Sequence, residues 1–346
     1  MIKEFNFNLG PKSISFSSEI TRMYNERQNR NLLDTMFVFQ PTYLKNFTWV
    51  RNYDLKYDFT KQLKFTFTAV NNAIIFEPNG GINGDADPAS QEYANYLLFR
   101  EGIDKVFNPF SSSSDTTNSF GGYNMNYGHN YNITYKIPFQ QLPLTDWLTT
   151  NIKYRGSYDW MRAPIAQPQF GHTIQNSSNF NVSGQADFGK IYNRLEFFRR
   201  VNGGQPQRGG RVTEKESNDK KEDGGDGEKK DEKDGDTEKK PKGELHPAWK
   251  VVGQMIMTLQ SATFTYSETD GILLPGFNNA STLLGMNNFG APGFGFVAGR
   301  QNYDLWGRPI SWGDETSFAP YAAANGWLVQ NPLLNVQHTI THTQSI

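Results

Sequence analysis

Apolar and polar residues alternate one by one over much of the chain, which is the period of a β-strand. The clearest case is residues 53–60, where tyrosine, leucine and phenylalanine alternate with aspartate, lysine and threonine, and residues 63–69 repeat it. The short stretch Thr60-Lys61-Gln62 joins the two runs and is long enough for a tight turn. We therefore predict an antiparallel hairpin with one apolar and one polar face.

The same alternation returns several times and predicts about ten strands in all. Further runs cover residues 123–135, 148–160 and 180–188, with weaker versions at 14–20, 262–266 and 336–340. Several runs reach about ten residues, whereas strands of globular proteins usually have about five or six. A tilted strand that crosses a membrane needs about 9–11 residues, so the lengths favour a transmembrane β-barrel over a soluble β-sandwich.

Two segments depart from this pattern. Near residues 189–202, Ile191, Leu195 and Phe198 follow helical spacing, which predicts one short helix between strands. Residues Thr213–Glu244 hold 9 Lys and 13 Asp plus Glu, so we expect residues 203–246 to form a disordered, charged insertion. It could be a docking tail or a calcium-binding loop, but a solvated insertion is the simpler interpretation. The predicted organisation is strands in 1–202, this insertion, and further strands with long loops in 247–346.

Composition narrows the class of protein further. Hydrophobic residues make up 36 % of the chain and aromatic residues 14 %, which suits a thin wall better than a compact soluble core. The absence of cysteine excludes disulfides, thiolate zinc sites and a cysteine nucleophile. The net charge of −1 argues against a nucleic-acid-binding protein. The chain has no run of about 18 apolar residues, so its sequence predicts no transmembrane helix. Because Met1–Asn8 lacks the features of a secretion leader, we expect the natural start to lie upstream.

The sequence offers little that predicts catalysis. His338 and His342 are four apart, but they lie in an alternating β-branched run, where four residues span about 13 Å, too far to share one ion. The glycine-rich run Gly293–Gly299 lacks the spacing and the βαβ context of a nucleotide-binding loop. Pairs of carboxylates are common only in the charged insertion, which has no rigid geometry to hold them. We therefore expect no enzyme activity, no catalytic residues, no cofactor and no metal site.

Several short motifs, in order along the chain, resemble the SprA family, also called Sov, which is the translocon of the type IX secretion system. The segments that carry the resemblance are Phe47–Asn72, Tyr131–Phe139, Leu142–Trp147, Thr173–Ser177, Ile191–Asn202, Tyr266–Phe277 and Ala291–Gly299. The resemblance runs from about residue 1 to the C-terminus and is interrupted by the charged insertion. It implies an all-β, antiparallel outer-membrane barrel of about 36 strands, of which this chain would be one arc.

The resemblance also implies a function and partners. The lumen of the family's barrel passes folded cargo proteins that carry a C-terminal signal, and in some bacteria the translocon also serves gliding motility. The implied partners are these cargo proteins, a PorV-like outer-membrane barrel, a periplasmic plug protein and the lipid of the outer membrane. This chain departs from the family in being far shorter and in lacking a leader. We expect its charged insertion to lie in the periplasm.

The alternation predicts which side chains face which environment. Leu55, Tyr57, Phe65 and Phe67 would face lipid or packed protein, and Lys56, Asp58, Lys64 and Thr66 would face the lumen. Two other functions stay open from the sequence. One is a smaller outer-membrane porin or nutrient receptor, and the other is a soluble β-sandwich that binds surfaces such as glycans through its aromatic residues.

Overall fold

The computed structural model describes residues 7–30, 39–108, 110, 120–139, 145–201, 247–282, 284–287, 289–301, 318–330 and 337–346. The chain divides into two compact units. The first comprises Met1–Pro138, Thr150–Gly184 and Phe264–Ile346, and the second comprises Phe139–Thr149 and Gln185–Thr263. The predicted charged insertion, 203–246, and with it His246, lies outside the described residues.

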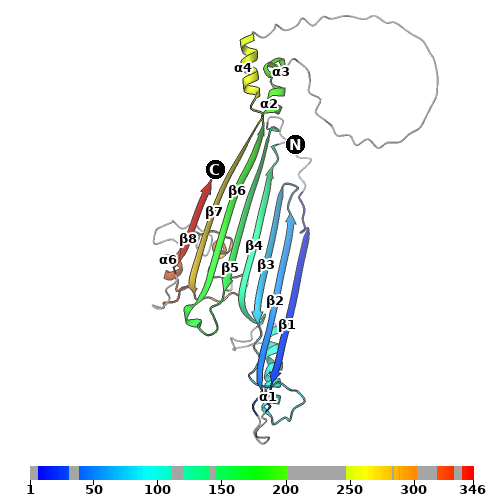
Figure 1. Cartoon of the computed structure of the whole chain (residues 1–346), viewed down its shortest axis with the longest axis vertical. Helices are drawn as coiled ribbons and strands as arrows, with labels where there is room; N and C mark the ends of the chain where they lie inside the picture. Colours follow the sequence, from blue (N-terminus) through cyan, green and yellow to red (C-terminus); the bar gives the residue numbers. More distant parts are fainter. Residues whose placement is uncertain are drawn as a thin grey trace, which may run out of the picture. The chain divides into compact units, whose positions relative to one another are not determined.

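The strands form one eight-stranded antiparallel sheet in which each strand pairs with the next along the chain (Figure 1). Their bounds are β1 Ser13–Arg27, β2 Thr42–Asp58, β3 Leu63–Ile74, β4 Tyr123–Ile137, β5 Leu148–Met161, β6 His172–Asp187, β7 Ser261–Phe277 and β8 Thr339–Ser345. The order β1 to β8 makes β1 and β8 the two edges of this sheet. The described strands form a single sheet, so they do not build the two packed layers of a β-sandwich.

The predicted hairpin is confirmed by the pairing of β2 with β3. Tyr57 pairs with Phe65 and Leu55 with Phe67, so the alternating residues of the two strands are in register. The turn is closed by Thr60, whose hydroxyl oxygen accepts a hydrogen bond from the Leu63 backbone N–H at 2.9 Å. A threonine side chain that bonds the backbone two or three residues later is a common way to start a turn.

Most other alternating runs also form strands, although their number and lengths differ from the prediction, and β8 shares only residues 339–340 with the run predicted at 336–340. The structure shows eight strands in the described residues, against about ten predicted. Most are longer than their alternating runs, and β6 begins at His172, well before residue 180, where the alternation becomes clear. The first residues of β6, His172–Asn179, are mainly serine, threonine, asparagine and glutamine, so no apolar alternation marks them in the sequence.

The prediction of a single helix was wrong. The described helices are α1 Gln91–Phe107, α2 Phe188–Arg194, α3 Glu196–Val201, α4 Pro247–Met257, α5 Phe294–Val297 and α6 Phe318–Ala324. Helix α1 begins with Ser90, whose hydroxyl accepts a hydrogen bond from the Tyr93 N–H. Its buried Val106 packs with Phe47 of β2 and with Ile75. The helix expected near 189–202 is divided in two, because Leu195 has extended backbone angles, φ −79° and ψ 118°.

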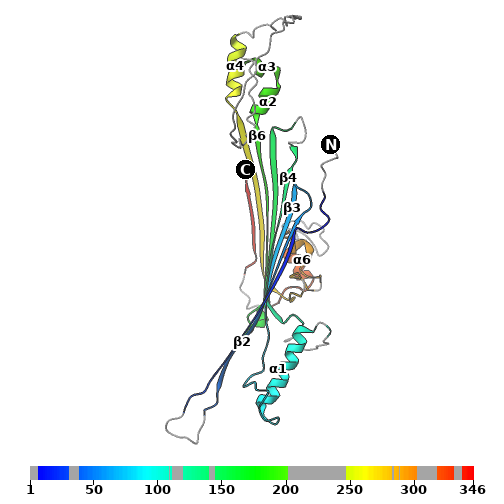
Figure 2. The ribbon, with the colours of Figure 1, turned by 90° about the vertical axis from the view of Figure 1, so that its right-hand side faces the viewer.

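The largest core forms between one face of the sheet and a long segment that follows β7. We call residues 278–282, 284–287, 289–301 and 318–330 the cover. Seen along its edge in Figure 2, the sheet has α6 and α1 on the same side. Fully buried members of the core include Tyr158 and Trp160 of β5 and Met286, Phe296 and Phe318 of the cover. Within the described residues, no helix has the length and hydropathy needed to cross a bilayer.

Candidate functional site

One face of the sheet carries mainly apolar and aromatic side chains and the other carries polar ones, as the strand registers show. On one face, Leu55, Phe67, Tyr131 and Gly156 lie in one row across β2 to β5. The next row on that face joins Tyr57, Phe65, Ile133 and Tyr154. We call this the aromatic face. Its members come from four strands, so the apolar character belongs to the sheet and not to a single hairpin.

The opposite face, which we call the polar face, has a matching row. Lys56, Thr66, Asn132 and Arg155 are neighbours across the same four strands. Successive side chains of a strand point to opposite faces, so this row lies behind the row of Leu55 and Phe67. The registers confirm that the two predicted sets of side chains lie on opposite faces of the sheet. One set is Leu55, Tyr57, Phe65 and Phe67, and the other is Lys56, Asp58, Lys64 and Thr66.

A hollow of about 280 Å³ is lined mostly by residues of the polar face. Its lining is Thr66, Thr68, Asn130, Tyr131, Asn132, Arg155, Gly156, Ser157, Ser177 and Asn179. Hydroxyl and amide groups dominate, and Arg155 supplies the one formal charge. None of these residues is an aspartate, glutamate or histidine, so the hollow lacks an ordinary general base. It can offer hydrogen bonds to a polar chain that passes over it.

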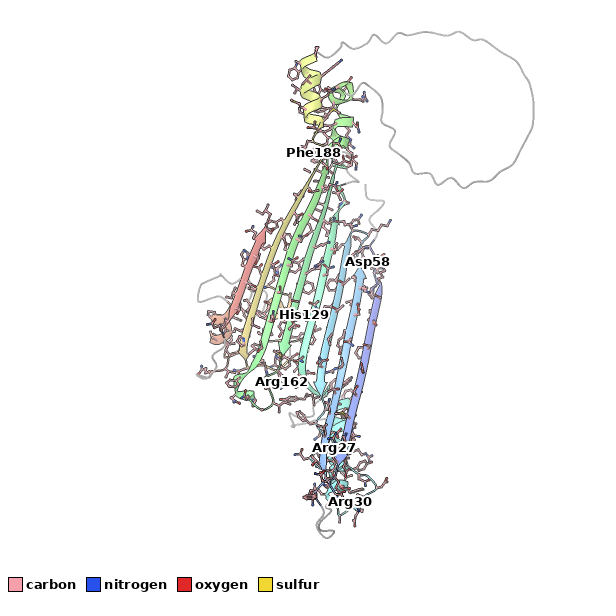
Figure 3. The ribbon with its side chains drawn as sticks, in the orientation of Figure 1. Arg27, Arg30, Asp58, His129, Arg162 and Phe188 are labelled. Carbon is pink, nitrogen blue, oxygen red and sulfur yellow. The ribbon has the colours of Figure 1, made fainter. Side chains whose placement is uncertain are left out.

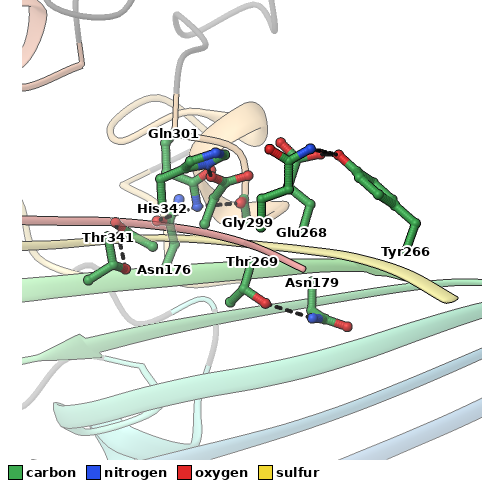
Figure 4. Close-up of polar contacts among 12 residues, drawn as sticks. Asn176, Asn179, Tyr266, Glu268, Thr269, Gly299, Gln301, Thr341 and His342 are labelled. Carbon is green, nitrogen blue, oxygen red and sulfur yellow. Dashed lines mark hydrogen bonds and ion pairs between the residues drawn. The ribbon is translucent and has the colours of Figure 1, made fainter. Parts of the chain in front are cut away.

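Asparagine and hydroxyl groups continue the polar face onto β7. The Asn179 side-chain amide donates to Thr269 Oγ1 at 2.7 Å, and Ser267 Oγ lies 3.4 Å from the same nitrogen. These contacts are shown in part in Figure 4. Polar side chains therefore continue on this side of the sheet from β3 to β7.

Part of the aromatic face is bonded to the cover through polar atoms at the ends of its rings. The hydroxyls of Tyr131 and Tyr154 both donate to the Ala298 carbonyl oxygen, at 2.5 and 3.3 Å. The Nε2 atom of His129, which is labelled in Figure 3, lies 2.9 Å from the Val297 carbonyl oxygen. These aromatic residues therefore fix the position of the cover as well as packing against it.

The glycine-rich run Gly293–Gly299 belongs to this cover and contains α5. Its Phe296 ring stacks on Phe318 with centroids 4.1 Å apart and meets Tyr158 edge-to-face. The run is therefore a packing element of the core. Phe67 of the aromatic face also packs against this core, whereas Phe65, Ile133 and Ile152 lie outside it.

A partly buried cation lies where β5 ends. The Arg162 guanidinium lies over the Tyr123 ring, 3.8 Å from its centroid, and its Nε donates to the Asn124 carbonyl oxygen (Figure 3). Burial lowers the pKa of Arg162 from its ordinary value. The stacked ring and the carbonyl oxygen partly replace the water that the guanidinium loses.

The structure places the histidines at unrelated positions. His172 Nδ1 accepts the Ala163 backbone N–H at 3.0 Å. His338 precedes β8, while His342 lies within it and its Nδ1 is 2.5 Å from Asp270 Oδ1. The pairing of β7 with β8 brings His342 beside the carboxylate of Asp270.

Glu268 completes a cluster with Asp270 and His342 that the sequence did not predict (Figure 4). One ligand atom from each residue lies within 4.8 Å of the others. Glu268 also accepts a hydrogen bond from the Tyr266 hydroxyl at 2.9 Å. Alternation along β7 puts Glu268 and Asp270 on one face, but only the pairing of Asp270 with His342 adds the histidine.

No model of a known protein family matches the chain, and no curated protein matches it either.

Proposed function

We propose that this chain forms part of the wall of a protein-conducting barrel in the bacterial outer membrane, the translocon of the type IX secretion system. The observation that supports this best is the pair of matching rows across β2 to β5. Leu55, Phe67 and Tyr131 make one side of the wall apolar, and Lys56, Thr66 and Asn132 make the other side polar. A wall between lipid and a wet channel requires this division.

Strand length supports the same proposal. Strands β1 to β7 have between 12 and 17 residues, and about 9–11 are needed to cross a bilayer at a tilt. The excess leaves room for the cover to occupy part of the aromatic face while another part meets lipid. In this arrangement Phe65, Ile133 and Ile152, which lie outside the core, contact acyl chains.

The identity of the translocon and its partners rests on the motifs that resemble the SprA family. Segment Phe47–Asn72 of that resemblance forms most of β2 and β3, and Tyr131–Phe139 includes the end of β4. On this proposal the polar face borders the path of folded cargo proteins. The proposed partners are a PorV-like barrel and a periplasmic plug protein, and the proposed location is the bacterial outer membrane. A second proposed role is in gliding motility.

The polar lining of the hollow agrees with a transport role. A folded protein that passes must not adhere, and hydroxyl and amide groups form hydrogen bonds that water replaces at little net cost. A patch of exposed apolar side chains there would instead retain cargo.

The test is fractionation combined with an export assay in the bacterium that carries the chain. We expect the chain in the outer-membrane fraction, and we expect its deletion to stop release of a reporter that carries a C-terminal secretion signal. Recovery of the chain as a soluble monomer would contradict the proposal that it forms part of a barrel wall. A smaller porin or receptor would be indicated if deletion left export intact but slowed the uptake of small solutes.

A further inference from the structure

Helix α4, Pro247–Met257, presents large apolar side chains that no described residue covers. Trp249 is 58 % exposed and Met255 is 70 % exposed, and Val251, Val252 and Ile256 are exposed as well. These five residues belong to a helix of only 11 residues. Such a dense apolar patch is unfavourable in water and marks a surface that binds something.

The apolar residues lie on one side of α4. At 100° per residue, Val251, Met255, Val252, Ile256 and Trp249 fall within an arc of roughly 160°. We call this arc the α4 stripe. Lys250 and Gln254 lie on the opposite side of the helix, so the helix is amphipathic.

The remaining side of α4 is held by its own unit. A Cβ added to Gly253 would come 2.7 Å from Val201 Cγ2, so the helix backbone approaches α3 closely there. The Tyr192 hydroxyl of α2 lies 2.9 Å from the carbonyl oxygens of both Ile256 and Leu259. The α4 stripe is therefore displayed by a fixed helix whose inner side is already occupied.

The composition of the neighbouring sequence excludes one occupant. Residues Thr213–Glu244 contain no aliphatic, aromatic or methionine side chain, so they cannot cover the α4 stripe with apolar surface. A protein partner is also a poor match. Stable protein interfaces use about 20–30 residues on each side, and the stripe offers five. Lipid needs no shape complementarity and fits a short row of aliphatic side chains with one tryptophan.

Aromatic residues at the strand ends of the same unit point to lipid as well. Trp147 precedes β5 and Phe188 follows β6, and their rings stack with centroids 6.2 Å apart. The Asp187 N–H donates to the Trp147 carbonyl oxygen, which sets these two strand ends side by side. Rings of this kind mark the boundary between lipid and water in membrane barrels.

We propose that α4 lies in the membrane–water interface with the α4 stripe among lipid acyl chains, where it anchors the connection between β6 and β7 to the bilayer. This inference rests on the proposed function, because it requires the strands to cross a membrane. Lys250, on the opposite side of the helix from the stripe, would face away from the acyl chains, as the polar side of an interfacial helix does.

The experiment uses the absence of cysteine in the chain. Single variants Val252→Cys and Met255→Cys carry an environment-sensitive fluorophore on the stripe, and Gln254→Cys is the control on the same helix. All three positions are exposed, so the packing of Gly253 on Val201 is kept. The full chain is studied in outer membranes to which phospholipids with spin-labelled acyl chains are added. We expect several-fold stronger quenching at positions 252 and 255 than at 254.

Two more labels separate failure of this inference from failure of the proposed function. Phe65→Cys tests the aromatic face and Lys64→Cys is its control. Lipid quenching at 65 without quenching at 252 and 255 would contradict the proposal that α4 lies in the membrane interface. It would still agree with the proposal that the strands form a barrel wall. Quenching at none of these positions would overturn both. Labels at 252 and 255 that are shielded from aqueous iodide, but are not quenched by lipid, would show that a protein covers α4.

Discussion

The side-chain amide of Asn176 donates a hydrogen bond to the carbonyl oxygen of Phe296 at 2.9 Å. The two residues are 120 positions apart, and both are almost completely buried. The same amide reaches the Arg300 carbonyl oxygen at 3.1 Å, and Asn176 Oδ1 lies 3.3 Å from both the Ile272 N–H and Gln301 Nε2 (Figure 4). One side chain of β6 thus joins the sheet to the cover.

Replacing Asn176 with leucine should release the cover. The change leaves buried carbonyl and N–H groups without partners, which typically costs about 1–3 kcal/mol for each group left unsatisfied. We expect a lower unfolding midpoint in urea and faster proteolysis within residues 289–301. Asn179→Leu is the matched control on the same strand, because its partners Thr269 and Ser267 lie outside the core. Equal effects of the two variants would contradict this role of Asn176.

Glycine should be required at position 299 and much less so at position 326. Both residues have positive φ, 73° and 70°, so alanine at either costs about 1–2 kcal/mol for a left-handed backbone. A Cβ at Gly299 would also meet the Ser177 carbonyl oxygen at 2.6 Å, whereas nothing lies within 4 Å at Gly326. Urea unfolding should therefore show a larger loss of stability for Gly299→Ala than for Gly326→Ala.

Arginine at position 65 should impair membrane insertion, while arginine at position 64 should not. Phe65 belongs to the aromatic face and lies outside the core, so a charge there would meet lipid at a cost of about 2–4 kcal/mol near the midplane. Lys64 lies on the polar face and already carries a charge. The measurement is the fraction of each variant in the outer membrane. Phe67→Arg is less informative, because Phe67 packs against the core and would also disturb the cover.

Loss of the Tyr192 hydroxyl should loosen α4 without unfolding the sheet. Tyr192→Phe removes the contacts with Ile256 and Leu259, and a net hydrogen bond contributes about 0.5–1.5 kcal/mol. Amide hydrogen exchange should become faster in 255–260 and stay unchanged in 123–137. Tyr266→Phe, which loses the bonds of its hydroxyl to Glu268 of β7 and Gln344 of β8, should leave exchange in α4 unaltered.

The sequence predicted those parts of the fold that local alternation determines. The hairpin of β2 and β3 and its turn at Thr60 follow from a period of two and a short connection. Helix α1 was missed although Phe99, Ile103 and Val106 follow helical spacing, because exposed apolar residues such as Leu97 and Leu98 blur this stripe. The alternating faces of residues 55–58 and 64–67 were predicted correctly for the same local reason as the hairpin.

Contacts between distant segments could not be predicted. The segment that contains Phe296 has no clear period, and its place on the sheet depends on Asn176 and Tyr158, more than 100 residues earlier. The cluster of Glu268, Asp270 and His342 depends on the register of β7 with β8 across a connection of about 60 residues, and no local signal sets it.

The pairing of each strand with the next has a consequence for how the sheet is assembled. Because β2 needs only β1, and β3 only β2, the sheet can grow one strand at a time in the order of the strands along the chain. The long stretches after Ile74, Asp187 and Phe277 interrupt this growth little, since each doubling of a connecting loop costs only about 0.6 kcal/mol of closure entropy. The connections can therefore gain or lose whole helices over evolution while the order of the strands is kept.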